Sequence, residues 1–394
     1  MKVTRREAVK LGMGAAAAAL LAACAPAAQP SPTAAPKPAA PAPAPAGSPE
    51  AAPAAQPAAA SPAAAPAAPA SVTTLRMMYP IRVPSPDYAF IWAGDELGYF
   101  REEGLKLDIQ PTAGSVDSVR LTAVGQGDLS VAGCDGVVIG RTQGQNMRCC
   151  FVHAQRQIYG VAVLDDSPIK AVADLKGKTL GVQGLGSGAV PYTKGLLKEN
   201  GLNPDADVTF VEIGVGPAAI SALKGGRVDA SAAWDTEFFQ YEQAGLSLRY
   251  FNSPALAHLP GSGVHIRDED LDKRAQLIEG YLRAYTKGMV FSMENPAAAV
   301  ELMGRQVPDV LKDKDKSVGT LKKRQEIFKL PDEANGVWGW SKVSLWDEYV
   351  NFLFDNGLMK SKVDGSEVWT DRFLQAANRF DADQLRRQAR DWRG

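Results

Sequence analysis

The sequence predicts an α/β protein of two lobes, each built on a mainly parallel sheet flanked by helices. Short strand-like runs alternate with helical runs from Leu75 to Tyr250, the pattern of parallel strands joined by crossover helices. The alternation comes as two series, and the second begins near Tyr159. About 320 of the 394 residues follow a low-complexity N-terminal part, which is enough chain for two separate cores.

The first series predicts four strands joined by three helices. The strands are expected at 75–79, 105–110, 128–132 and 147–154, and the helices at 88–97, 116–124 and 137–143. In the first helix, Ala89, Trp92 and Ala93 recur at helical spacing, which favours packing of Trp92 against the sheet. Loops are expected where the strands end, at 112–115 and 133–136.

The second series repeats the pattern. Its strands are expected at 159–164, 179–183, 208–213 and 228–232, with helices at 190–200 and 217–224. Segments 127–132 and 228–233 resemble each other, and each leads into a loop with an aspartate, Asp135 or Asp235. Chance similarity and two lobes of the same topology both explain this echo.

After Tyr250 the pattern becomes mostly helical. An apolar stripe through Ile278, Tyr281 and Tyr285 predicts one helix, and Asn295 before Pro296 predicts the N-terminus of another. Further helices are expected over 345–356 and through Phe373. Because this tail needs a sheet to cover, we expect lobe 1 at 73–155 plus 252–394 and lobe 2 at 156–251.

The N-terminus predicts export and lipid anchoring. Arg5-Arg6 precedes a short apolar stretch, the order found in twin-arginine signals, and Cys24 ends a run that resembles a lipoprotein box. A simple cleavage site beside an incidental cysteine is the alternative. Residues 25–72 are almost only Ala, Pro, Ser and Gln, a composition that predicts a disordered tether. The expected location is therefore extracytoplasmic, as a membrane-anchored lipoprotein.

Charge and cysteine content exclude several classes of partner. With 43 Lys+Arg against 44 Asp+Glu, no nucleic-acid partner is expected. If Cys24 carries the lipid, the cysteines left in the chain are Cys134, Cys149 and Cys150. They allow one disulfide from Cys134 to either neighbour, although buried free thiols are favoured. Three histidines and the lack of metal-ligand spacing predict no metal site and no cofactor.

Candidate ligand-binding residues follow from the predicted strand ends, because parallel α/β lobes bind ligands at the carboxyl edges of their sheets. The loop 184–188, Gly-Leu-Gly-Ser-Gly, follows a strand and opens a helix, so its backbone N–H groups favour an anionic or carbonyl acceptor. It matches neither a Walker loop nor a dinucleotide fingerprint. The candidates are Tyr88, Gly114, Ser115, Asp135, Arg156, Gly186, Ser187, Gly188, Gly216, Trp234 and Asp235.

Each candidate has a structural alternative. Trp234, just past a predicted strand, is expected to stack on a planar ligand, or else to pack in the core. Arg156 pairs with a ligand anion or is a surface arginine. Asp135 and Asp235 accept hydrogen bonds from a ligand or cap the following helices. The glycines serve a ligand or form ordinary turns. No nucleophile elbow or acid/base pair is evident, which favours binding without catalysis.

Residues 91–105 contain Gly98-Tyr99-Phe100 and Glu103-Gly104-Leu105, and further segments follow at 125–128, 174–178, 224–230, 369–373 and 378–381. In content and order these segments resemble the nitrate/sulfonate/thiamine-precursor solute-binding proteins of ABC importers. This resemblance implies a two-lobed Venus-flytrap fold, a small-molecule solute bound between the lobes, and a permease and ATPase as partners.

The resemblance leaves the solute open, since the family binds nitrate, sulfonates, aromatic carboxylates, pyrimidine precursors or flavins. Tyr88 and Trp234 beside Asp135 and Asp235 suit a planar heterocycle, which we favour, whereas the Gly-Ser-Gly loop with Arg156 suits a small organic anion. The related pyrimidine synthases carry a cysteine-rich iron-binding motif that the sequence around Cys149-Cys150 does not reproduce. A ligand-sensing lipoprotein of the same fold is a further alternative.

Overall fold

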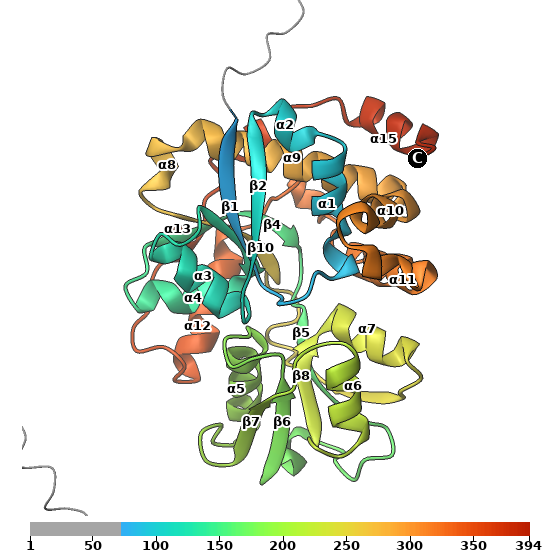
Figure 1. The fold of residues 1–394 in the computed structure, drawn as a ribbon. Coiled ribbons are helices and arrows are strands. Elements are labelled where there is room, and N and C mark those ends of the chain that lie inside the picture. Colours follow the sequence, from blue (N-terminus) through green and yellow to red (C-terminus); the bar gives the residue numbers. More distant parts are fainter. Residues whose placement is uncertain (1–71) are drawn as a thin grey trace, which may run out of the picture. The chain divides into compact units, whose positions relative to one another are not determined.

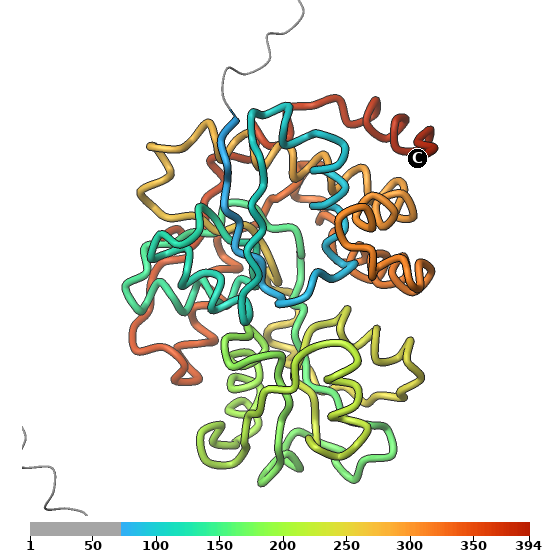
Figure 2. Tube along the Cα trace, in the orientation of Figure 1, coloured from blue at the N-terminus to red at the C-terminus, as the bar shows by residue number. Residues whose placement is uncertain are grey.

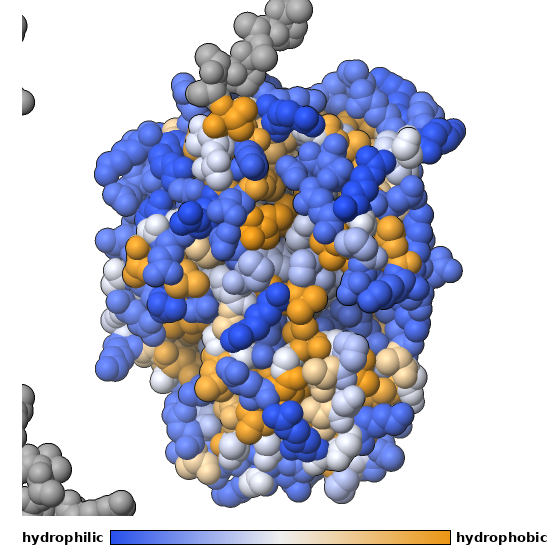
Figure 3. All heavy atoms as spheres, in the orientation of Figure 1, coloured by the Kyte–Doolittle hydropathy of each residue, from blue (hydrophilic) through white to orange (hydrophobic). Residues whose placement is uncertain are grey.

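The computed structural model describes residues 72–394, which form ten strands in two five-stranded sheets (Figure 1). The predicted leader 1–24, its Cys24, and the tether 25–71 lie outside the described residues. Within the described part, no helix has the length and apolar character needed to cross a bilayer. Most of the face seen in Figure 3 is hydrophilic, and its apolar residues form small separate patches.

The first sheet has the order β2-β1-β3-β10-β4. Its strands are β1 (Thr73–Tyr79), β2 (Leu105–Pro111), β3 (Leu129–Gly133), β4 (Met147–Ala154) and β10 (Ser262–Arg267). Helices α3 (Ser115–Ala123) and α4 (Cys134–Thr142) lie on one side of it, and α1 (Ala89–Glu96), which packs on α9 (Ala275–Glu294) and α10 (Pro296–Gln306), lies on the other (Figure 1). Every residue of β3 is buried because helices cover both faces.

The second sheet has the order β7-β6-β8-β5-β9. Its strands are β5 (Tyr159–Leu164), β6 (Lys178–Val182), β7 (Val208–Glu212), β8 (Ala230–Trp234) and β9 (Leu248–Phe251). Its helices are α5 (Ala189–Glu199), α6 (Pro217–Lys224) and α7 (Asp235–Gln243). The chain passes from the first sheet to the second after β4 and returns before β10, a path that Figure 2 traces. The lobe bounds given above stay a prediction.

The two sheets share one topology. In each, four strands run in one direction and the strand that follows a crossing, β10 or β5, runs against its neighbours. The sequence echo lies at equivalent places. Asp128 accepts a hydrogen bond from the Arg76 N–H and donates its own N–H to the Arg76 carbonyl, and Asp229 does the same with Thr179. Two lobes of the same topology therefore explain the echo better than chance.

The strand β10 was not predicted, since the part after Tyr250 was expected to be mostly helical. The segment is short and buried at five of its six residues, so it shows neither strand alternation nor helical spacing. It becomes a strand because β3 and β4 pair with it on both sides. Two boundaries also differ, since α4 begins at Cys134, where a loop was expected, and Trp234 is the last residue of β8.

Several C-terminal helices pack beside the first sheet. Asn295 caps α10 by accepting a hydrogen bond from the Ala298 N–H at 3.0 Å. Helices α14 and α15 contact α9, and α13 contacts β4. The remaining helices are η1 (Pro86–Tyr88), α2 (Tyr99–Glu102), η2 (Val172–Leu175), α8 (Asp270–Lys273), η3 (Pro308–Leu311), α11 (Lys314–Gln325), η4 (Asp332–Ala334), α12 (Val343–Asp355), α13 (Gly365–Val368), α14 (Leu374–Ala377) and α15 (Ala382–Asp391).

Candidate functional site

A cavity lies where the carboxyl ends of strands from both sheets meet. Its free volume is about 20 Å³, room for about one water molecule. Five of the residues predicted from the sequence line it: Tyr88, Gly114, Ser115, Ser187 and Trp234. The other lining residues are Pro80, Ile81, Ile158, Tyr159, Gln183 and Arg324. Rules about strand ends therefore located the cavity, although they missed its arginine.

The loops of the two lobes touch each other at this cavity. The hydroxyls of Ser115 and Tyr159 lie 2.9 Å apart, and the Gly186 carbonyl accepts the Val116 N–H at 3.1 Å. Gly188 lies against the Tyr159 hydroxyl of its own lobe and against the Asp135 carboxyl group of the facing lobe, since a Cβ atom there would come within 2.3 Å and 2.7 Å of these oxygen atoms. The predicted residues Gly186 and Gly188 thus serve the contact between lobes, and the geometry is closed.

Tyr88 and Trp234 supply aromatic surface. Tyr88 is packed edge-on to Tyr79 with ring centroids 5.3 Å apart, and burial raises the pKa of its hydroxyl to about 12, so the hydroxyl stays protonated. The Trp234 indole N–H is buried and has no hydrogen-bond partner among residues 72–394. Trp92 packs in the core, as its helical spacing predicted. The cavity therefore offers ring faces together with an unused donor.

Asp135 lies beside this cavity, in the first turn of α4. It is 1% exposed, and neither of its carboxylate oxygens has a hydrogen-bond partner among the described residues. Burial raises the pKa of the carboxyl group to about 7. Near neutral pH this side chain is able to donate or accept a hydrogen bond, which is the versatility that a heterocycle with both N–H and ring-nitrogen groups requires.

We expect Asp135→Asn to raise the free energy of unfolding at pH 8. The folded wild type binds the Asp135 proton with a pKa of about 7 against 3.8 for the ordinary group, so its stability falls as pH rises through that window. The gain should be on the order of 4 kcal/mol at pH 8 and should shrink towards pH 4. Urea unfolding of both proteins from pH 4 to 8 measures it, and a pH-independent difference would contradict the assignment.

Arg324, from α11, is the charged residue that sequence reasoning missed. It is 1% exposed and pairs with Asp87 at 3.1 Å and with Asp235 at 3.0 Å. It also lies 3.2 Å from the Thr236 hydroxyl, which itself donates to Asp87. Asp87 lies in η1, which follows strand β1 of the first sheet. Asp235 is the first residue of α7, which follows strand β8 of the second sheet. Arg324 therefore bridges the two lobes at the wall of the cavity.

The charge around the cavity favours a neutral ligand. Asp87, Asp135 and Asp235 are carboxyl groups in buried surroundings, and Arg324 is the guanidinium beside them. Burial lowers the pKa of His153 well below its usual value, so this ring adds no positive charge. Among the residues that line the cavity, Arg324 carries the charge, and its ion pairs with Asp87 and Asp235 offset that charge. The Nε and Nη1 groups of Arg324 have no partner among residues 72–394, which leaves donors for a carbonyl oxygen.

Besides Asp135, Gly186 and Gly188, three more predicted residues do not line the cavity. Arg156 lies at a second hollow beside the crossing segments, with its guanidinium 3.5 Å from the Glu326 carbonyl. Gly216 donates its N–H to the Glu237 carboxylate at 2.6 Å. Asp235 pairs with Arg324 instead of capping α7, whose N-cap residue is Trp234.

Three side chains deeper in the first lobe have metal-ligand chemistry. Cys134, Cys149 and His265 bring their ligand atoms within 4.8 Å of one another. Cys134, Cys149 and Cys150 are all free and buried, the state favoured from the sequence. The expectation of no metal site considered only spacing along the chain. It overlooked this group because its members come from α4, β4 and β10.

Three relatives of known name align with most of the chain. The riboflavin-binding protein RibY of Chloroflexus aurantiacus is 23% identical over 76% of this chain and 85% of its own. The formylaminopyrimidine-binding protein of Halalkalibacterium halodurans is 24% identical, over 68% of this chain and 82% of the relative. The 4-amino-5-hydroxymethyl-2-methylpyrimidine phosphate synthase of Legionella pneumophila is 21% identical, over 74% of this chain and 89% of the relative. Two of these relatives are binding proteins and one is named as an enzyme.

Solved structures and a family model agree on the fold. A protein of Bordetella bronchiseptica superposes with a TM-score of 0.65 at 21% identity, covering 77% of this chain and 96% of its own. The aliphatic sulphonate-binding protein SsuA of Escherichia coli superposes with a TM-score of 0.55 at 20% sequence identity. The superposition covers 75% of this chain and 92% of SsuA. The fold is the two-lobed one of periplasmic binding proteins, as the sequence resemblance implied. Because the NMT1/THI5 like model matches residues 85–299, more than half of the chain, this protein belongs to that family.

Proposed function

We propose that this protein is the extracytoplasmic solute-binding component of an ABC importer and that its solute is a neutral planar heterocycle. One observation carries the choice of solute: the cavity combines the rings of Tyr88 and Trp234 with the guanidinium of Arg324, whose charge is already offset by Asp87 and Asp235. The names of the riboflavin-binding and formylaminopyrimidine-binding relatives support the same class. A pyrimidine or a flavin suits this lining, whereas nitrate or a sulfonate would have to compete with Asp87 and Asp235 for Arg324.

Capture requires the lobes to separate. A free volume of about 20 Å³ admits no heterocycle, so the closed geometry has to open before a solute enters. Hinge closure around a ligand is the common behaviour of two-lobed binding proteins. A bound ring would replace part of the contact between the lobes. It would lie between Tyr88 and Trp234, with its carbonyl oxygens directed towards Arg324.

The location and the partners belong to the same proposal. The sequence of the leader, with Arg5-Arg6 and Cys24, supports export and a lipid anchor, and residues 25–72 would tether the binding lobes to the membrane. A permease and an ATPase would receive the solute. Detection of an acylated Cys24 by mass spectrometry of the protein from its native membrane would test the anchor.

A thermal-shift screen of the purified chain tests the class of solute. Riboflavin, a formylaminopyrimidine, an alkanesulfonate and nitrate should be compared at equal concentration, because a ligand at 100 times its Kd stabilises the folded state by about 2.7 kcal/mol. We expect a heterocycle to raise the melting temperature and the two anions to leave it unchanged. Stabilisation by the sulfonate or nitrate alone would overturn the heterocycle proposal.

Native mass spectrometry of the same samples separates binding from catalysis. A binding protein should release the solute with unchanged mass. One relative is named as a synthase, so conversion of a bound pyrimidine compound into a product would support the enzyme alternative instead.

We expect Trp234→Ala to weaken binding of the heterocycle through the loss of ring stacking, by about 1 kcal/mol or more. Trp234→Phe keeps a ring face and should retain most of the affinity. Trp338→Ala removes a half-buried tryptophan that does not line the cavity, and it serves as the control. Titration calorimetry compares the three variants, and equal affinity of Trp234→Ala and wild type would assign Trp234 a structural role.

A further inference from the structure

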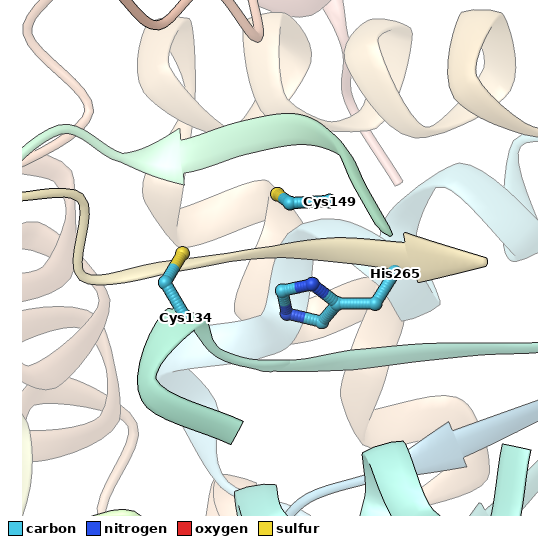
Figure 4. A group of neighbouring side chains, drawn as sticks. All are labelled: Cys134, Cys149 and His265. Carbon is cyan, nitrogen blue, oxygen red and sulfur yellow. The ribbon is translucent and has the colours of Figure 1, made fainter. Parts of the chain in front are cut away.

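A compact group of two thiols and one imidazole lies inside the first lobe (Figure 4). Cys134 is the first residue of α4, Cys149 belongs to β4, and His265 belongs to β10. All three side chains are 0% exposed. One ligand atom from each lies within 4.8 Å of the other two, close to the separation that a shared metal ion imposes on its ligands.

The imidazole of His265 is held in the orientation of a metal ligand. Its Nε2 lies 3.0 Å from the carbonyl oxygen of Ala132, a bond in which the ring nitrogen donates its hydrogen. The lone pair then resides on Nδ1, and Nδ1 is buried without a hydrogen-bond partner among residues 72–394. Metal-ligating histidines commonly donate their second ring N–H to a backbone carbonyl in this way.

The backbone around the group departs from regular pairing where the ligands lie. His265 is the cross-strand partner of Cys149, and the register between β10 and β4 shifts between Val264 and His265. Bulges of this kind re-aim side chains. Gly263 leaves room for the sulfur, because a Cβ atom there would lie 2.7 Å from Cys149 Sγ and 2.4 Å from the Phe151 carbonyl oxygen.

We propose that Cys134 Sγ, Cys149 Sγ and His265 Nδ1 bind a thiophilic divalent cation of the zinc type. Two thiols and an imidazole are soft and intermediate donors, which favour zinc over magnesium or calcium. Binding releases the two thiol protons, so two thiolates neutralise the charge of the ion.

The position of the site points to a structural role. β10 is the strand that returns from the second sheet, and it lies between β3 and β4. An ion held by α4, β4 and β10 would fasten this strand to its neighbours, since metal binding to a folded site adds directly to folding free energy. The site does not line the cavity between the lobes, so this inference is independent of the proposed function.

Cobalt titration of the reduced full-length chain tests the proposal. We expect one equivalent of Co²⁺ to bind and to give thiolate charge-transfer and tetrahedral d–d absorption bands, and Zn²⁺ to displace it. Cys134→Ser, Cys149→Ser and His265→Asn should each lose these bands. Cys150→Ala is the matched control, because Cys150 is equally buried beside Cys149 but lies outside the group, and it should keep them.

Three outcomes would overturn the site. They are no stoichiometric metal in the reduced wild type, bands that persist in both serine variants, and a Cys134–Cys149 disulfide in the isolated protein with no metal uptake after reduction. X-ray absorption of the zinc-loaded wild type gives a second measurement that needs no variant. Two sulfur atoms and one nitrogen around zinc would support the proposal even if a variant fails to fold, and a shell of oxygen ligands alone would refute it.

Discussion

Arg324→Met should lower the free energy of unfolding by about 3–5 kcal/mol, since it leaves buried carboxylates without their partner. The guanidinium lies 3.1 Å from the Asp87 carboxylate and 3.0 Å from that of Asp235, and Arg324 and Asp87 are almost wholly inaccessible to solvent. Methionine keeps much of the side-chain volume, so the loss reports charge more than packing. Urea unfolding at pH 7 measures the difference.

Lys323→Met is the matched control for this variant. Lys323 is adjacent in sequence but partly exposed, and it pairs with Glu326 at 2.8 Å. An exposed pair of this kind contributes about 0–1 kcal/mol, so the control should unfold almost like the wild type. Equal losses in the two variants would mean that Arg324 is not the partner of buried charges.

A rescue variant separates charge from shape. Adding Asp87→Asn to Arg324→Met removes one uncompensated carboxylate from the site, and it should restore part of the lost stability. If the double variant loses as much unfolding free energy as the two single variants together, the two residues are not coupled.

Most of the α/β framework could be predicted because its signals are local. β4, β5 and α6 begin and end where the sequence predicted, since apolar runs and Gly or Pro residues mark their limits. The strand β10 could not, because its state depends on pairing with strands more than a hundred residues away in sequence. Tertiary pairing decides such a segment, and no local pattern reports it.

The same distinction explains the outcome at the site. Tyr88, Ser115 and Trp234 line the cavity because they lie at or after the carboxyl ends of strands, which is a topological rule. Arg324 is the last residue of the run Lys322-Lys323-Arg324, and such a run of basic residues indicates an exposed segment of a helix. Only the packing of α11 against η1 and α7 turns its third residue inwards.

Gly114→Ala should strongly disfavour closure of the lobes. A Cβ atom on Gly114 would lie 2.4 Å from the Gly186 carbonyl oxygen and 2.5 Å from Ser187 Cα. Both are backbone atoms of the facing lobe, so no side-chain rotation relieves the contact. Gly114 also has a φ of +150°, which an alanine adopts only with strain.

The expected cost to the closed state is about 1–3 kcal/mol, the usual range for overpacking. Because the solute is proposed to bind in the closed state, its affinity should fall by roughly 10- to 100-fold. Small-angle scattering of the variant with saturating solute should give a larger radius of gyration than that of the wild type. Calorimetry measures the affinity.

Gly144→Ala is the control that isolates the contact between lobes from backbone strain. Gly144 has a φ of +82°, and a Cβ atom there would meet nothing within 4 Å. Both variants should lose some stability from strain, but Gly144→Ala should close and bind like the wild type. Equal affinities for the two variants would show that Gly114 and Gly186 do not meet in the binding cycle, whereas a loss confined to Gly114→Ala ties solute affinity to this single backbone contact.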